Sequence, residues 1–364
     1  MAKYRANFDF ESSLFDPTYD RNHDKYKKIN YEFEYLALFE LSSQDILLSP
    51  YPEAYPQLYI DWLKQNNFCY KIEKDSGTKD ACDWWGDISN TQLEKMCNSK
   101  LFAHQFCHDN LLSFPTREII QNYQKFMACK FEGIKILKSP WSVAGRGNIY
   151  LNGSMNENLD KRIKRSFESG PHILESRVQR FLDLGLIVGE MGIEDVYLNS
   201  VDRLGQYKGS IYPENQREFV TALRQVLGID LIQLNQVYAR LFHAYRNNGT
   251  VNPIQVDAFA YKDKGDKICL VPINEVNCRK TMGIVAKMLK HVLSLKGHLE
   301  FIILPCNSEL NTQKIWDKSL PFLTNANDYV TLTPETGVGP CRKFQIAVKS
   351  SQKTAEQLIE VFPN

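Results

Sequence analysis

The stretch NEVNCR, residues 274–279, decides the fold expected for this chain, because it places three polar groups on alternate residues. These are the Glu275 carboxylate, the Asn277 amide and the Arg279 guanidinium. Side chains two residues apart on a β-strand point to the same side, so a strand here would present all three groups to one ligand. The plain alternative is that they form the solvent-facing side of an antiparallel strand.

A second strand is expected at residues 256–261, and the polar, Gly-containing segment 262–266 is typical of a hairpin turn between the two strands. The hairpin would place Asp257 on the same sheet as Glu275 and Asn277. Three oxygen ligands without sulfur or imidazole suit Mg²⁺, which keeps some water and completes its shell with substrate phosphates. The pattern therefore predicts a site for magnesium and a nucleotide.

A loop of small residues lies earlier in the chain, in IKILKSPWSVAGRGNIY, residues 134–150. An apolar strand ends at Lys138, the loop contains Gly145 and Gly147, and a second apolar strand follows. Such a loop lets backbone N–H groups approach an anion while the lysine supplies positive charge. It is not a Walker loop, since neither Gly-Lys-Ser/Thr nor a helix follows. A glycine-rich hairpin alone is more often a plain turn than a phosphate cover.

These segments resemble the ATP-grasp superfamily, over roughly residues 95–305 and in the family's order. A further matching element is HILESRV, residues 172–178, an apolar strand that runs into an acidic hinge. The resemblance implies that two α+β subdomains grip ATP and that the product is usually an acyl phosphate. One departure is Cys278, which stands where many family members have proline between asparagine and arginine.

The resemblance implies roles for residues around the nucleotide. Lys138, which is also a catalytic candidate, and Lys100 would contact phosphate oxygens. Glu175 and the Val178 backbone would form the adenine hinge, and Asp183 lies where an acidic residue often takes the ribose hydroxyls. Simpler interpretations stay open: surface lysines, a solvated strand end at Glu175 and a loop carboxylate at Asp183.

The resemblance also implies that Asp257, Glu275 and Asn277 hold magnesium, with Glu275 bridging two ions. Attack of a carboxylate on the γ-phosphate joins two anions, so positioning and charge neutralisation would dominate catalysis. Arg279 and Arg146 are candidates for holding a substrate carboxylate or the transferred phosphoryl group, because guanidinium pairs bidentately with either. Both could instead form structural ion pairs. The Gly145/Gly147 hairpin would be a mobile lid that excludes water.

Three functions from different classes follow. The first is an ATP-dependent carboxylate–amine ligase that acts on a small carboxylic acid through an acyl phosphate and releases ADP and phosphate. The second is a small-molecule phosphotransferase, for which no His or Asp motif identifies a base. The third, a non-catalytic nucleotide-binding module, is disfavoured by the intact set Asp257, Glu275 and Asn277. The sequence names neither the acid nor the amine, and it leaves the oligomeric state open.

The expected architecture is an α+β ATP-grasp fold preceded by a small α/β lobe. Residues 1–110 would form the lobe, 111–174 the lid subdomain and 175–364 the C-terminal subdomain with the metal site and tail. Residues 1–30 are polar and without a period, so they are expected to wrap the surface, and a helix is expected at 114–128. Within the lobe, the order is strand 45–49, helix 55–65 and strand 68–72. The loop DWWGD, at 83–87, either borders the second substrate or packs the lobe against its neighbour.

Composition fits a globular enzyme, since 364 residues with 43% apolar side chains can bury a large core. The formal charge of +1 makes nucleic acid an unexpected partner. No signal-like start or membrane-length apolar run appears, so a cytoplasmic protein is expected. Nine irregularly spaced cysteines suit reduced thiols. Cys107, His104 and His108 lack a second ligand pair for zinc, which favours helix-surface positions for all three.

Overall fold

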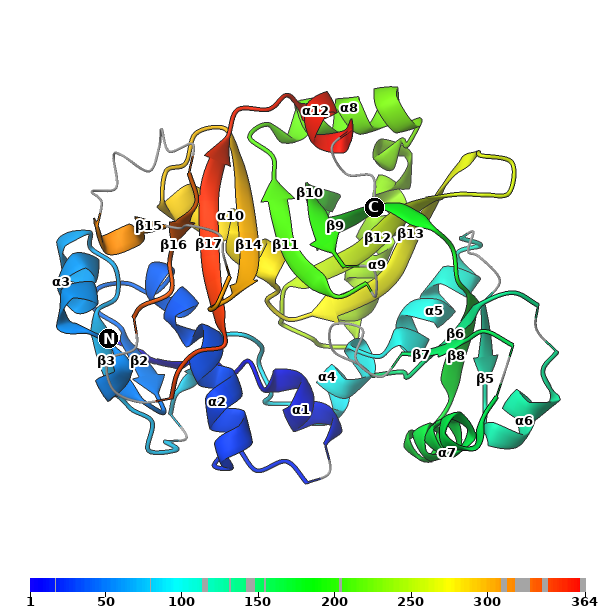
Figure 1. Ribbon diagram of the computed structural model, residues 1–364, viewed down its shortest axis with the longest axis horizontal. Coiled ribbons are helices and arrows are strands. Elements are labelled where there is room, and N and C mark those ends of the chain that lie inside the picture. The colour runs from blue at the N-terminus through cyan, green and yellow to red at the C-terminus, as the bar shows by residue number, and fades with distance from the viewer. Residues whose placement is uncertain are drawn as a thin grey trace.

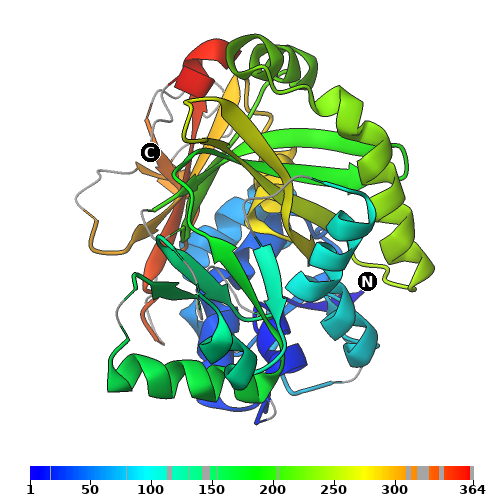
Figure 2. The same ribbon diagram turned by 90° about the vertical axis from the view of Figure 1, so that its right-hand side faces the viewer.

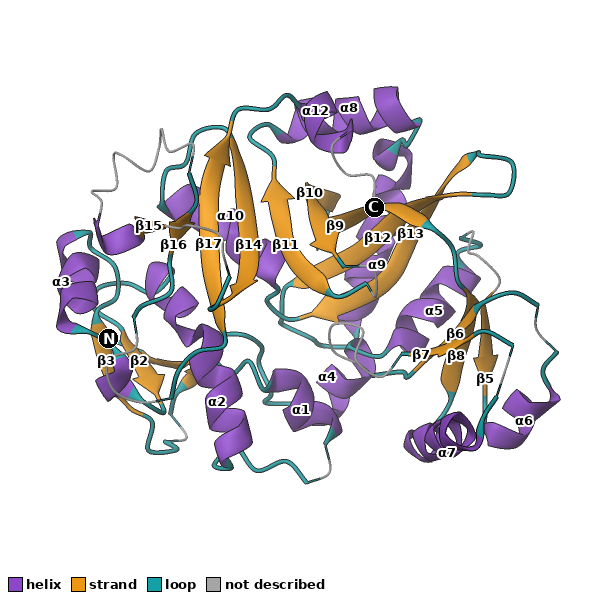
Figure 3. Cartoon of the chain, viewed as in Figure 1, coloured by secondary structure: helices purple, strands orange, loops and turns teal. Residues whose placement is uncertain are grey.

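The computed structural model gathers its elements around a large central sheet, as Figures 1 and 3 show. It describes all residues except 17, 79, 113–116, 131, 142–147, 154, 203–204, 309–312, 318–327, 336–339 and 361–364. Within the described part, the strands form three sheets. No helix among these residues is both long enough and apolar enough to cross a membrane.

The N-terminal lobe is a small parallel sheet with helices around it. Its strands run in the order β3-β2-β1-β4 and are β1 (Lys3–Arg5), β2 (Ile46–Ser49), β3 (Lys71–Lys74) and β4 (Cys82–Asp83). The helical segments before the lid are α1 (Phe10–Phe15), α2 (Asp24–Phe33), η1 (Glu34–Phe39), η2 (Pro52–Ala54), α3 (Gln57–Gln65), α4 (Thr91–Cys97) and α5 (Lys100–Asp109). The predicted α/β order of this lobe is therefore confirmed.

The prediction that residues 1–30 wrap the surface is wrong at β1, which lies inside the N-terminal sheet. This strand pairs in parallel with β2 on one side and with β4 on the other. Its three residues, two of them basic, are too few to show an alternating pattern. Long-range pairing, and not local pattern, therefore fixes this strand.

The lid subdomain is a four-stranded antiparallel sheet with helices α6 (Tyr123–Ala128), α7 (Glu157–Ser166) and η3 (Phe167–Ser169). Its strands run in the order β5-β8-β6-β7 and are β5 (Arg117–Ile120), β6 (Lys135–Lys138), β7 (Ile149–Leu151) and β8 (His172–Ser176). The helix expected at 114–128 is wrong in its first part, since residues 117–120 pair with β8. The shorter helix α6 begins after Asn122, whose side chain accepts a hydrogen bond from the Lys125 backbone N–H.

The central sheet has nine strands in the order β13-β12-β9-β10-β11-β14-β17-β16-β15. They are β9 (Arg180–Gly189), β10 (Gly192–Val201), β11 (Tyr207–Tyr212), β12 (Ile254–Lys262), β13 (Ile268–Cys278), β14 (His298–Pro305), β15 (Gln313–Lys314), β16 (Val330–Thr331) and β17 (Phe344–Ser351). The helical segments of this region are α8 (Gln216–Leu227), η4 (Leu231–Leu234), α9 (Asn235–Asn247), α10 (Met282–Val292), η5 (Ile315–Asp317) and α12 (Ala355–Glu360). The rotated view shows the lid sheet below the β12–β13 hairpin (Figure 2).

Alternation along β9 separates the two faces of this sheet. Leu184 and Leu186 pack in one apolar core with α8 and α9, whereas Ile187 and Tyr197 pack in another core with α10. Residue 185 must be glycine, because a Cβ there would lie 2.1 Å from the Tyr197 ring. The odd-numbered residues of β9, Asp183 among them, therefore face the α10 side.

The last part of the chain returns to the N-terminal lobe. The guanidinium carbon of buried Arg342, just before β17, lies 3.9 Å from the centre of the Tyr31 ring in α2. Glu32 accepts a hydrogen bond of 2.7 Å from the Phe344 backbone N–H. The Tyr35 hydroxyl shares a hydrogen bond of 2.8 Å with the Thr333 hydroxyl. Segments some 300 residues apart are thus packed together.

Candidate functional site

The hairpin expected upstream of residue 274 is present as β12 and β13. In its register, Asp257 lies directly opposite Glu275, and Gln255 lies opposite Asn277. Directly opposed residues project to the same face, so the pairing brings four polar side chains together. The three residues predicted as metal ligands therefore lie in one cluster.

Asp257 is surrounded by amides. Its Oδ1 accepts hydrogen bonds from Gln255 at 2.8 Å and from Asn199 at 3.3 Å, and its Oδ2 accepts one from Asn277 at 3.0 Å. Burial and the facing carboxylate of Glu275 raise the pKa of Asp257 to about 7, against these amides. Two carboxylates that oppose each other without a cation between them fit a divalent ion bound by hard oxygen ligands.

Lys100 contacts the Glu275 carboxylate directly. Its ammonium lies 2.7 Å from Glu275 Oε1, and the Lys100 side chain is only 7% exposed. The lysine begins α5, where the Ser99 side chain caps the helix by accepting from the Leu101 backbone N–H. The interpretation of Lys100 as a surface lysine is therefore wrong. His104 and Cys107 follow in α5, and Cys107 is fully buried, so its expected surface position is also wrong.

Lys138 and Glu175 form a buried ion pair at the edge of the lid facing β13. Lys138 also donates to Asn274 Oδ1 at 3.3 Å. Burial lowers the pKa of Lys138 to about 8, partly offset by Glu175. Burial opposes ionisation of Glu175, but the charges of Lys138 and Arg117 outweigh it and lower its pKa to about 2. Neither residue is the solvated side chain of the simpler interpretation.

Arg117 is a site residue that the sequence did not reveal. Its guanidinium donates to Glu175 Oε2 through Nε at 3.0 Å and Nη2 at 2.8 Å, and it also reaches Asn274 at 3.4 Å. The helix expected at 114–128 concealed the strand that brings this side chain to Glu175. Side chains from three lid strands thus meet beside Asn274, the first residue of the stretch 274–279.

Asp183 lies inside β9, opposite Asn199 of β10, and not in a loop. Its Oδ1 is 3.1 Å from Arg180 Nη1. Its Oδ2 is buried and has no hydrogen-bond partner among the described residues. Burial raises the pKa of Asp183, against the charge of Arg180. Val178 lies nearby in the three-residue connection between β8 and β9.

Arg279 connects the site to the N-terminal lobe. It forms an ion pair with Glu11 of α1, donates to Asn277 Oδ1 at 3.3 Å and lies 5.5 Å from the Trp85 ring centre. Trp85 and Trp84 are each only 5% exposed, and the Trp84 indole N–H donates to Glu40 at 2.8 Å. The tryptophan loop therefore packs the lobe against residues 279–280.

The remaining predicted residues, Gly145, Arg146 and Gly147, lie outside the described residues. Among the described residues there is also no cluster of three or more His, Cys, Asp or Glu suited to a metal. The candidate set has two carboxylates and an amide, which suits Mg²⁺ because this ion keeps several waters and takes phosphate oxygens. All nine cysteines are unpaired.

Neither a model of a known protein family nor a curated protein matches the sequence. The fold is similar to solved structures. N5-carboxyaminoimidazole synthetase from Staphylococcus aureus superposes with a TM-score of 0.50 at 10% identity, over 90% of this chain and 94% of the other. The ADP complex of that enzyme gives 0.48 at 11% identity, over 89% and 93%.

The biotin carboxylase–β,γ-ATP complex from Campylobacter jejuni gives a TM-score of 0.45 at 11% identity, over 85% of this chain and 71% of the other. At such identities the similarity bears on the fold and not on the substrate. The chain has the ATP-grasp fold, with a parallel α/β lobe at its N-terminus and antiparallel sheets after it.

Proposed function

We propose that the protein is an ATP-dependent ligase that joins a small carboxylic acid to an amine. The observation that carries this proposal is the meeting of two charge clusters on β13. Lys100 faces the Asp257–Glu275 pair, while Lys138 lies at Asn274, next to Glu275 in the chain. Carboxylates suited to a cation, on β12 and β13, therefore lie beside lysines from α5 and β6 that suit phosphate oxygens, as ATP chemistry requires.

Asp257, Glu275 and Asn277 would hold magnesium, which when bound would neutralise phosphate charge. The fit is supported by the opposed carboxylates of Asp257 and Glu275, whose mutual repulsion a cation relieves. The Lys100 ammonium, paired with Glu275, already offsets part of the negative charge of the two carboxylates. A bound phosphate gives Lys100 an alternative anionic partner.

The reaction has two steps. A carboxylate oxygen of the acid attacks the γ-phosphorus of ATP, and the bond from that phosphorus to the β,γ-bridging oxygen breaks, so ADP leaves. The amine then attacks the carbonyl carbon, the bond to the phosphate oxygen breaks, and the amine loses a proton. Lys138 and Lys100 lower the repulsion between the two anions in the first step. Arg279 is the candidate for holding the acid, after exchanging its Glu11 partner for a carboxylate.

The nucleotide base would lie between β8 and β9. The Glu175 side chain is occupied by Lys138 and Arg117, and its backbone lies in a strand paired on both sides. Adenine contacts would therefore come from backbone groups in the connection containing Val178. Asp183 offers the ribose an oxygen that has no hydrogen-bond partner among the described residues. The Gly145/Gly147 hairpin, with Arg146, remains our candidate for a cover that excludes water.

The test is a turnover screen of small carboxylic acids with candidate amines. A ligase releases ADP and free phosphate only when the acid is present, and hydroxylamine in place of the amine gives a hydroxamate. A stable phosphorylated product without free phosphate would instead identify a phosphotransferase. Glu275→Ala should abolish either activity, whereas the exposed carboxylate of Glu194, on β10 of the same sheet, serves as the control position.

A further inference from the structure

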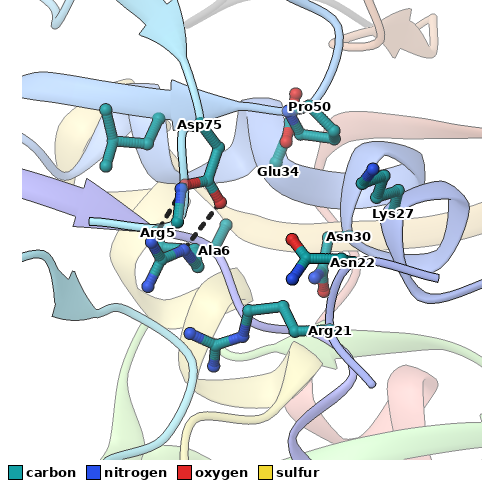
Figure 4. Close-up of a pocket in the computed structure, with 11 residues that line it drawn as sticks. Arg5, Ala6, Arg21, Asn22, Lys27, Asn30, Glu34, Pro50 and Asp75 are labelled. Atoms are coloured by element: carbon teal, nitrogen blue, oxygen red, sulfur yellow. Dashed lines mark hydrogen bonds and ion pairs between the residues drawn. The ribbon is translucent and has the colours of Figure 1, made fainter. Parts of the chain in front are cut away.

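A pocket lies at the carboxyl edge of the N-terminal sheet and shares no lining residue with the candidate site (Figure 4). Arg5 ends β1, Asp75 follows β3 and Asp83 ends β4, so its wall is built where the parallel strands finish. β2 and β3 lie on one side of β1 and β4 on the other, so the strand order reverses here. In open α/β sheets, ligands bind at this edge, beside such a reversal.

One cation of the pocket is held rigidly. Arg5 is 5% exposed, and its guanidinium pairs with both oxygens of Asp75, at 2.7 Å through Nε and 2.9 Å through Nη2. Figure 4 shows this pair at one wall of the pocket. Arg5 and Asp75 together are electrically neutral, so they shape the wall but leave its net charge to other residues.

Two further cations are held less firmly. Arg21 lies 3.5 Å from Asp83 and donates to the Tyr19 hydroxyl at 3.2 Å, and a quarter of its side chain is exposed. The Lys27 ammonium has no ion-pair partner among the described residues that surround it. Both side chains line the pocket, from the loop before α2 and from α2 itself. Both can therefore turn toward a ligand without losing a strong contact.

A third acid, Glu34, lines the pocket besides Asp75 and Asp83. Glu34 is buried, and its Oε1 accepts from the Tyr55 hydroxyl at 2.9 Å and from the Ser49 hydroxyl. Burial raises the pKa of Glu34 to about 7, so this side chain is partly protonated at neutral pH. Since Arg5 is paired with Asp75 and Arg21 lies beside Asp83, Lys27 is the lining cation for which no ion pair is found in the described part of the chain.

We propose that this pocket binds a small molecule through an oxyanion group, a phosphate or a carboxylate, held by Arg21 and Lys27 in front of Arg5. A guanidinium pairs bidentately with either group, and an ammonium adds a point charge. The part of the pocket between Arg21 and Asp83 has a volume of about 270 Å³, and the part that Lys27 lines adds about 30 Å³. The larger of these volumes is just below the sizes typical of ligand pockets, so it favours a small metabolite. The site uses no residue of the proposed ligase chemistry.

Calorimetry of the full chain without nucleotide tests this proposal, at fixed ionic strength, with inorganic phosphate, glycerol 3-phosphate and succinate as probes. At least one probe should bind, and Arg21→Ala should weaken its binding about tenfold or more. Lys27→Ala should give a smaller loss. The control is Lys3→Ala, which removes the same charge from the opposite end of β1, where Lys3 pairs with Glu73 at the surface.

Stronger binding of the two phosphates identifies a phosphorylated ligand, and stronger binding of succinate identifies a carboxylate. The proposal is overturned if no probe binds, or if Arg21→Ala and Lys27→Ala bind as the wild type does. Arg21→Lys keeps the charge beside Asp83, so its intermediate affinity would distinguish lost recognition from lost folding. Because ATP is absent, the outcome does not depend on whether the ligase reaction occurs.

Discussion

Two buried carboxylates, Glu175 and Asp257, have pKa values shifted in opposite directions. Glu175 lies between Lys138 and Arg117, and its pKa falls to about 2. Asp257 lies among neutral amides with another carboxylate opposite, and its pKa rises to about 7. Asp257 lies on β12, which pairs with β13, and the two cations that hold Glu175 contact Asn274 of β13. Glu175 is thus flanked by two cations, whereas Asp257 has no ion-pair partner among the described residues.

The two clusters therefore differ in role: the Glu175 cluster holds the lid against β13, and the Asp257–Glu275 pair is our candidate for binding a cation. In the Glu175 cluster, two cations from β5 and β6 hold one carboxylate from β8, and both cations also reach Asn274. The Asp257–Glu275 pair keeps a repulsion that Lys100, at Glu275, and the charge of Arg279 partly offset. Substitutions in the Glu175 cluster should therefore mainly lower the free energy of unfolding, whereas substitution of Glu275 should mainly weaken ligand binding.

The largest effect should come from Glu175→Ala, which leaves Lys138 and Arg117 buried without their carboxylate. Breaking a buried ion pair in this way costs about 3–5 kcal/mol of unfolding free energy. Urea denaturation measures the change. The control is Glu157→Ala in α7 of the same subdomain, whose pair with Lys161 is largely exposed and should matter little. Equal losses of unfolding free energy in the two variants would contradict a special contribution of the buried Glu175 ion pairs.

The second effect is a dependence of stability on pH. Because the folded pKa of Glu175 lies below its usual 4.5, its contribution is present above pH 4.5 and is lost as pH falls through about 2. The shift corresponds to about 3 kcal/mol, by the free energy per pKa unit. Across this pH range, the free energy of unfolding should fall more steeply with decreasing pH in the wild type than in Glu175→Gln, as urea denaturation at a series of pH values would measure.

The contribution of Asp257 to stability should change with pH in the opposite direction. Its folded pKa is raised, so its contribution is present below its usual 3.8 and is lost as pH rises through about 7. Asp257→Asn should therefore reduce the loss of stability between these values. A variant that instead becomes less stable than the wild type near pH 7 would argue against repulsion between Asp257 and Glu275.

The third effect is stabilisation by magnesium with a non-hydrolysable ATP analogue. At a ligand concentration a hundred times the dissociation constant, binding adds about 2.7 kcal/mol to the unfolding free energy. Glu275→Ala should lose the magnesium-dependent part, while Glu194→Ala should keep it. Thermal unfolding with and without chelator measures this. Full stabilisation of Glu275→Ala would remove Glu275 from the metal site.

The smallest effect should come from Lys100→Met, which removes the cation that faces Glu275 but leaves a carboxylate that is one-quarter exposed. We expect a loss of about 1 kcal/mol, as for a partly solvated ion pair. Added Mg²⁺ should restore part of the loss, since it replaces the missing charge. Lys3→Met, at a surface pair, should show no such rescue.

The sequence predicted the parts of the site whose geometry is local. Alternation placed Glu275 and Asn277 on one face, and the hairpin placed Asp257 on the same sheet. The pairing of Asp257 directly opposite Glu275 depends on a register shift between Asp257 and Phe259, which the sequence did not indicate. The segment resembling ATP-grasp proteins was therefore sufficient to predict the fold.

The long-range pairings were not predictable in this way. Arg117 reaches Glu175 because β5 and β8 pair across more than fifty residues, and no local pattern announces that register. The same holds for β1, whose short basic sequence becomes an inner strand through its two neighbours. Sequence periodicity reports a residue's own strand or helix, but not which distant strand will lie beside it.

The packing of Arg342 against Tyr31 has a consequence for how the protein is made. During synthesis the ribosome releases the first lobe long before residues 333–344, which supply Thr333, Arg342 and the backbone contact to Glu32. Early domains usually fold first as a chain emerges. Here the N-terminal lobe is completed by residues translated some 300 positions later, so chains truncated or stalled in between should leave its tyrosines exposed to chaperones and proteases.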